Sequence, residues 1–151
     1  MKPEPPTIPV DDLDQFRTLK DAATVLRLPY FKIQRAARAG IIVKGDLLIY
    51  SNLSARAIFT VRKKDWKVQD VWPAVGNRPL GLCWADAART SFWRADANLQ
   101  ILYRYDAATG AVREGIQLPE GAPVLHGCQL VGNQMYFTDD LGWICRFRMP
   151  V

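Results

Sequence analysis

Three basic residues recur at three-residue intervals in a stretch from 29 to 40 that carries no acidic residue: Lys32, Arg35 and Arg38. At 100° per residue these side chains share one stripe of a helix, and small alanines beside them permit close approach. Basic side chains contact DNA phosphates, and Gln34 or Arg35 has the chemistry to read a base edge in the major groove. The spacing therefore predicts a DNA-contacting helix, with a solvated helix face as the alternative.

Sequence signals also define the elements that would position this stripe. Thr18 and Asp21 have capping-box spacing, and apolar residues follow them at helical intervals. Pro29 ends that helix and suits the first turn of a second one, which Gly40 would close. We therefore expect helix, tight turn, helix, short hairpin and helix between residues 16 and 59.

These residues resemble the helix-turn-helix of the excisionase and MerR-like superfamily, over about 45 residues. The matching segment runs from Thr18 to Leu28, then through Pro29–Ala39 to Gly40-Ile-Ile. The resemblance implies a wing at Ile41–Tyr50 and a third helix at Ser51–Phe59. It also implies a set of DNA-contacting residues: Tyr30, Lys32, Gln34, Arg35, Arg38 and, in the wing, Lys44. A protein-interaction module built on the same fold is the alternative.

The distribution of charge supports this division. The net charge is +5, but residues 15–64 hold 11 basic and 2 acidic residues (+9), whereas residues 65–151 hold 8 and 9 (−1). Three cysteines are an odd number, which fits a reducing compartment better than a disulfide framework. The sequence shows no membrane-spanning run and no secretory signal, so we expect a cytoplasmic protein without a membrane partner.

Short strand-like runs separated by turns follow residue 80, and they repeat with a period near 44 residues. The run Phe92–Asp96 resembles Tyr136–Asp140 at an offset of 44, and Leu102–Tyr105 resembles Ile144–Phe147 at an offset of 42. A repeat of this size is typical of a propeller blade. Because two such units cannot close a ring, the β half is either a small independent sheet or is completed by other copies of the chain.

Residues 80–120 also resemble one blade of the gluconolactonase and regucalcin-like propellers. The likeness rests on Gly81-Leu-Cys-Trp, on Phe92–Asp96 and on the hairpin Leu102–Val112. Leu80 stands where those lactonases carry a metal-binding glutamate, so the resemblance implies the architecture without the metal chemistry.

The residues of the β half give no catalytic or metal-binding pattern. His126 is the single histidine, and a site made of His126, Cys128 and Asp139 or Asp140 is less favoured than a structural histidine and a hairpin turn. Phosphate-binding glycine motifs and a nucleophile elbow are missing from the sequence. We therefore expect no catalytic residues, no metal and no cofactor.

The sequence predicts an α+β protein: a small N-terminal winged helix-turn-helix followed by an antiparallel all-β module of propeller-blade type. The expected divisions are a flexible arm at 1–13, the helix-turn-helix at 14–62, a linker or first strand at 63–80, and a β-meander at 81–151. The predicted function is DNA binding in transcription regulation, with the β module binding a ligand or driving oligomerisation. The alternative is a non-catalytic or degenerate propeller-type protein related to sugar lactonases, with residues 44–72 as its first blade; a fusion of unrelated halves is a third reading.

Overall fold

Sheet 1 is the first of three sheets in the computed structural model, which describes residues 4–10, 12–30 and 40–150. Its four strands follow one another in space as in sequence: β3 (Ile41–Lys44), β4 (Leu47–Asn52), β5 (Ala57–Arg62) and β6 (Val68–Pro73). Ile42, Ile49 and Ile58 are buried on the face that meets sheet 2. Sheet 1 therefore shares its core with the next sheet.

Sheet 2 repeats this meander and gains a strand from the N-terminal region. Its strands are β7 (Pro79–Trp84), β8 (Ser91–Asp96), β9 (Ile101–Asp106) and β10 (Val112–Gln117), with β1 (Thr7–Pro9) parallel to β10 at the outer edge. Every residue of β8 is buried, because sheets 1 and 3 cover its two faces. Sheet 2 is thus the middle layer of the molecule.

Sheet 3 also depends on the N-terminal region for its last strand. It consists of β11 (Cys128–Val131), β12 (Gln134–Thr138), β13 (Trp143–Arg148) and β2 (Asp14–Thr18), in that order. The third sheet is completed by a strand that precedes the first sheet in sequence, so its register is set by contacts more than 120 residues apart. The repeat near 44 residues is confirmed, since the matching runs are β8 with β12 and β9 with β13.

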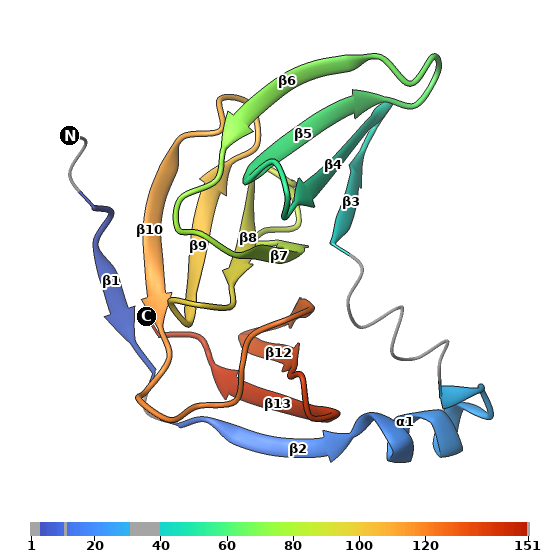
Figure 1. Cartoon of the computed structure of the whole chain (residues 1–151), viewed down its shortest axis with the longest axis vertical. Coiled ribbons are helices and arrows are strands. Elements are labelled where there is room, and N and C mark those ends of the chain that lie inside the picture. Colours follow the sequence, from blue (N-terminus) through green and yellow to red (C-terminus); the bar gives the residue numbers. More distant parts are fainter. Residues whose placement is uncertain (1–3, 11, 31–39, 151) are drawn as a thin grey trace.

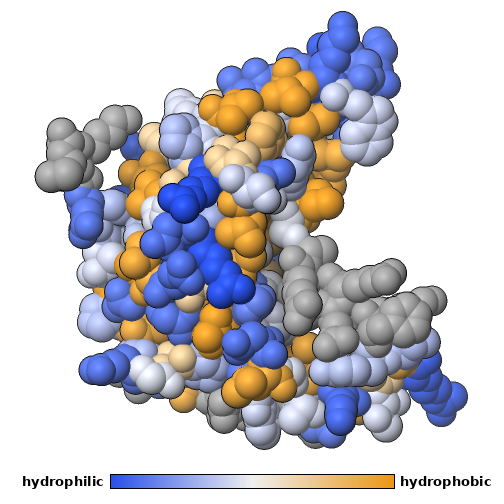
Figure 2. All heavy atoms as spheres, viewed as in Figure 1, coloured by the Kyte–Doolittle hydropathy of each residue, from blue (hydrophilic) through white to orange (hydrophobic). Residues whose placement is uncertain are grey.

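The three sheets form an open arc with their first strands β3, β7 and β11 on the inside (Figure 1). The inner strands approach closely: a Cβ on Gly81 would lie 2.5 Å from the carbonyl oxygen of His126 and 2.7 Å from the Cα of Gly127. Glycine at this position allows β7 and β11 to touch backbone to backbone. The surface over sheet 1 carries a group of apolar side chains (Figure 2).

The helix-turn-helix prediction is wrong. Thr18 caps a helix as expected, because its hydroxyl accepts a hydrogen bond from the Asp21 amide at 3.0 Å, but α1 (Leu19–Leu26) is the one helix whose bounds lie within the described residues. The predicted wing, Ile41–Tyr50, is the β3–β4 hairpin of a four-stranded sheet. The fold class is therefore nearly all β instead of α+β.

The predicted third helix, Ser51–Phe59, is instead the β4–β5 hairpin, in which Ser51 pairs with Ile58. The Asn52 side chain accepts a hydrogen bond from the Ala55 amide at 2.9 Å and stabilises the turn. Ile58 is fully buried in the core shared with sheet 2, so tertiary burial overrides the helix-forming residues of this window. Within the described residues, none of the helices is long and apolar enough to cross a membrane.

Candidate functional site

A groove of about 400 Å³ opens where the three inner strands converge. Sheet 1 contributes Ile41 and Ile42, sheet 2 contributes Leu82, and sheet 3 contributes the remaining lining residues: Gly127, Cys128, Gln129, Tyr136, Phe137, Thr138 and Ile144. None of these described lining residues carries a charged side chain. The groove therefore offers apolar surface together with one amide, two hydroxyls and a thiol.

A short chain of hydrogen bonds positions the sheet 3 side of the groove. The amide of Gly81 donates to the carbonyl of His126 at 3.1 Å, and the amide of Gly127 donates to the Thr138 hydroxyl at 3.2 Å. The Thr138 amide donates to the carbonyl of Gly127 at 2.9 Å. These contacts tie β7 and β12 to the backbone that leads into β11, so the lining rests on a fixed frame.

Two thiols meet beside the groove. The Sγ atoms of Cys83 on β7 and Cys128 on β11 lie 3.5 Å apart, and Cys83 is also 3.9 Å from the Met135 sulfur. The hydrogen bond to Cys83 and the loss of water contact raise the pKa of the Cys128 thiol well above its ordinary value. Cys128 therefore stays protonated at neutral pH, which keeps this side of the groove uncharged.

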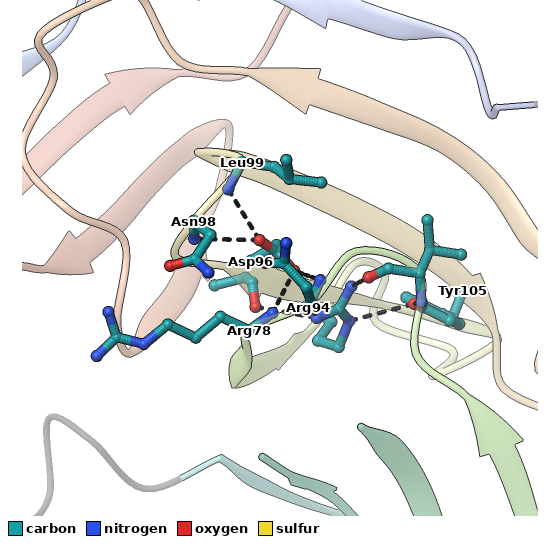
Figure 3. Close-up of polar contacts among 9 residues, drawn as sticks. Arg78, Arg94, Asp96, Asn98, Leu99 and Tyr105 are labelled. Carbon is teal, nitrogen blue, oxygen red and sulfur yellow. Dashed lines mark hydrogen bonds and ion pairs between the residues drawn. The ribbon is translucent and has the colours of Figure 1, made fainter. Parts of the chain in front are cut away.

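A second polar cluster lies between sheets 1 and 2, where Arg94 and Asp96 at the end of β8 are both fully buried (Figure 3). The Arg94 guanidinium donates to the Val75 carbonyl and to the Tyr105 hydroxyl, and it lies 3.7 Å from the Asp96 carboxylate. Cation–π contacts to Tyr103 and Tyr105, at 5.4 and 5.5 Å, complete its surroundings.

The Asp96 carboxylate accepts four backbone N–H groups, those of Asn77, Arg78, Asn98 and Leu99, at 2.9–3.1 Å (Figure 3). Two of these belong to the segment that joins sheet 1 to sheet 2, and two belong to the β8–β9 turn. The cluster is enclosed and its hydrogen-bonding groups are directed at the backbone, so its role is to fix one sheet against the next.

The residues predicted to contact DNA do not assemble into a described site. Tyr30 is half-buried, and Lys44 is exposed at the end of β3. The other four, Lys32, Gln34, Arg35 and Arg38, lie outside the described residues. The metal site weighed at His126, Cys128 and Asp139 is not formed: among the described residues, no group of three or more His, Cys, Asp or Glu side chains is placed to hold a metal ion.

Asp139 and His126 are nonetheless buried. The Asp139 carboxylate accepts the amides of Leu141 and Trp143 at 3.1 and 2.7 Å, which shapes the β12–β13 turn as the sequence suggested.

Solved structures decide the architecture. The Swd1 β-propeller domain of Myceliophteria thermophila is 12% identical with a TM-score of 0.50, over 66% of this chain and 32% of that one. Virginiamycin B lyase of Staphylococcus aureus is 15% identical with a TM-score of 0.51, over 76% and 42%. The chain has a β-propeller-like fold. Glutaminyl cyclase of Myxococcus xanthus is 15% identical with a TM-score of 0.55, over 74% and 53%.

This chain spans about a third to a half of the length of these solved structures. No family model and no curated protein matches it. Because the identities are low, the likeness shows the fold alone, and the ligands of those proteins are not inferred for this chain. The DNA-binding and transcription-regulation predictions rested on a helix-turn-helix that the structure contradicts, and they are withdrawn.

Sequence reasoning missed the groove. The signal that could have located it is a glycine just before or within each inner strand: Gly40, Gly81 and Gly127. Of the six residues that follow these glycines by one or two positions, five line the groove: Ile41, Ile42, Leu82, Cys128 and Gln129. The spacings between these glycines, 41 and 46 residues, would have identified three repeat units instead of two.

Proposed function

We propose that the chain is a non-catalytic, propeller-type module that binds a small neutral ligand in the groove between its inner strands. The uncharged lining of the groove carries this proposal. A volume of about 400 Å³ lies within the usual range of small-molecule sites, which are mostly apolar with a few convergent polar groups. Gln129, Tyr136 and Thr138 supply those polar groups.

The chemistry of the lining favours a carbohydrate as the ligand class. The Tyr136 ring offers a flat apolar surface on which a pyranose face can stack, and the amide of Gln129 can donate to and accept from sugar hydroxyls. The resemblance of residues 80–120 to blades of sugar-lactonase-like propellers supports the same class. A charged sugar would have to give up water without meeting an opposite charge, which is unfavourable.

Ligand-observed NMR tests this proposal with a panel of neutral sugars (glucose, galactose, maltose) and the charged analogue glucuronate. We expect saturation-transfer signals from at least one neutral sugar and weaker signals from glucuronate. Gln129→Ala should abolish the signal, because it removes the amide that would bond the sugar hydroxyls. Gln129 is exposed, so the variant should keep an intact core.

Gln69→Ala is the matched control, since Gln69 is an exposed glutamine on β6, outside the groove lining. Signals absent for the whole panel, or equally strong in Gln129→Ala and the wild type, would rule out sugar binding in the groove.

A further inference from the structure

Sheet 1 has an apolar outer face on the side away from sheet 2. One row of directly paired residues crosses all four strands on this face: Ile41, Tyr50, Phe59 and Val71. Directly paired residues of antiparallel strands project to the same face, and the Tyr50 and Phe59 rings stack at 5.4 Å. Ile41 is 59% exposed and Val71 is 53% exposed. The row therefore presents hydrocarbon to solvent at both edges of the sheet.

A second, equally apolar row lies beside the first and also crosses the four strands: Val43, Leu48, Val61 and Val68. Val68 is 52% exposed and Val43 is 38% exposed. The opposite face of the same sheet buries isoleucines against sheet 2. A sheet that is apolar on both faces is typical of an inner layer, and apolar surface gathers over this sheet in Figure 2.

We propose that the outer face of sheet 1 docks against the same face of a second copy, which gives a two-fold symmetric dimer. The two rows carry no charged residue, so the face is complementary to itself and suits an isologous interface. Two such sheets would pack about 10 Å apart, with their strands inclined by about 30°.

The face of sheet 3 that is turned away from sheet 2 is a poorer partner for this surface. Its paired rows are Gln129–Tyr136–Arg146 and Val131–Gln134–Arg148, which include two arginines. If these rows covered an apolar sheet, their guanidinium groups would lose water without gaining an opposite charge. Apolar contacts do not offset this desolvation free energy. Head-to-tail closure of a ring, sheet 1 against sheet 3 of the other copy, is therefore disfavoured.

The size of the face predicts a weak, reversible dimer. Four strands about 4.8 Å apart, with five residues each at about 3.4 Å, give a face of roughly 330 Å². The rows thus cover a small flat area, whereas each partner of a standard stable interface buries about 800 Å² of accessible surface, so we expect weak association. Dimerisation should accordingly depend on protein concentration.

Three valine-to-aspartate variants of the full chain test the surface by sedimentation equilibrium between about 10 and about 500 µM, a range that brackets micromolar affinities. Val71 lies on the outer face of sheet 1, Val131 on the face of sheet 3 turned away from sheet 2, and Val25 on α1; their exposures are 53%, 59% and 75%. We expect the wild type to approach twice its 17.1 kDa mass at the highest concentration. Val71→Asp should remain monomeric, whereas Val131→Asp and Val25→Asp should dimerise like the wild type.

Near-UV circular dichroism should show that each variant is folded. If Val71→Asp unfolds, Val71→Thr replaces it, because threonine keeps the shape and strand propensity of valine; we expect it to weaken dimerisation about tenfold. A wild type that is monomeric throughout would overturn the proposal. So would a monomeric Val131→Asp, which would indicate ring closure, or a Val71→Thr that dimerises as strongly as the wild type.

Discussion

The two interfaces between neighbouring sheets are built from opposite chemistry. Interface 2–3 joins sheets 2 and 3 through apolar and sulfur-containing side chains, including Cys83, Met135 and Phe137, all at most 1% exposed. Interface 1–2 joins sheets 1 and 2 through a stack of Trp72 on Phe92, with ring centroids 6.4 Å apart, bordered by the buried Arg94–Asp96 pair. Sheet 2, in which all six residues of β8 are buried, thus makes a different kind of contact on each of its two faces.

This difference teaches how each interface obtains its geometry. Apolar side chains can repack, so interface 2–3 should tolerate swaps that conserve volume. Buried charges need fixed partners, so interface 1–2 should hold the linker between sheets in one arrangement and fail when a partner is removed. We therefore call interface 2–3 the adaptable interface and interface 1–2 the specified interface, because fixed polar partners determine the geometry of the second.

Removing the Asp96 carboxylate should have the largest effect. Asp96→Ala would leave Arg94 buried without its counter-charge and would leave four backbone N–H groups without their acceptor. Breaking a buried ion pair costs about 3–5 kcal/mol of the free energy of unfolding. Urea denaturation followed by far-UV circular dichroism measures this loss. Asp140→Ala, an exposed aspartate in the β12–β13 turn, is the control and should change stability by less than about 0.5 kcal/mol.

An added methyl group between the inner strands should have the next largest effect. In Gly81→Ala the new Cβ would meet the backbone of His126 and Gly127, and neither can rotate away. We expect a loss of about 2–3 kcal/mol, at the upper end of the range for overpacking. Gly45→Ala is the control: its Cβ meets nothing within 4 Å, so only the strain of φ +57 remains, at about 1 kcal/mol. Equal losses in the two variants would mean that β7 and β11 can separate freely.

Conservative swaps at the two interfaces test the contrast directly. Tyr105→Phe removes the hydroxyl that accepts the Val75 amide at 2.9 Å and the Arg94 Nε–H at 3.2 Å, which should cost about 2 kcal/mol. Met135→Leu at interface 2–3 keeps volume and polarity and should cost less than about 1.5 kcal/mol. Urea midpoints of the two variants, measured side by side, give the comparison. A larger loss from Met135→Leu would reverse the assignment of the specified and the adaptable interface.

The sequence allowed part of this architecture to be predicted because its signals are local. The aromatic runs Phe92–Asp96 and Tyr136–Asp140 repeat with a propeller period, and both are second strands of their sheets. Thr18 was recognised as a helix cap from its spacing to Asp21. The wing predicted at Ile41–Tyr50 coincides with the β3–β4 hairpin, but Ser51–Phe59 was read as strand only in the alternative reading, because it combines a cap residue with good helix formers.

The remaining features depend on contacts that no local window contains. The pairing of β2 with β13, and of β1 with β10, joins residues more than 100 positions apart, so the N-terminal region could not be assigned to sheets 2 and 3. The groove has the same origin, since its lining comes from three sheets. Arg94 carries no sequence mark of burial, because the Val75 carbonyl that accepts its hydrogen bond comes near only when the linker folds back.

Acid should weaken the specified interface slightly, through the turn that follows β9. A hydrogen bond from Arg113, with further ones from the amides of Ala108 and Thr109, lowers the pKa of Asp106 to about 2. This turn ends at Gly110, whose φ is +72 and whose Cα faces the Trp72 ring of sheet 1 so closely that a Cβ would overlap it. An ordered turn at Asp106 therefore helps to hold sheet 2 on sheet 1.

Because the folded-state pKa of Asp106 lies below its unfolded value of about 4, the stabilisation is complete above pH 4 and is lost as the pH falls towards 2. Arg113 is 55% exposed, so solvent screening reduces the effect to about 1 kcal/mol. Asp106→Asn should be less stable than the wild type at pH 5, and its urea midpoint should fall less between pH 4 and pH 2. Parallel midpoints for the two proteins across that interval would show that the carboxylate contributes nothing, and interface 1–2 would then rest on its apolar core and on the Arg94–Asp96 cluster without help from this turn.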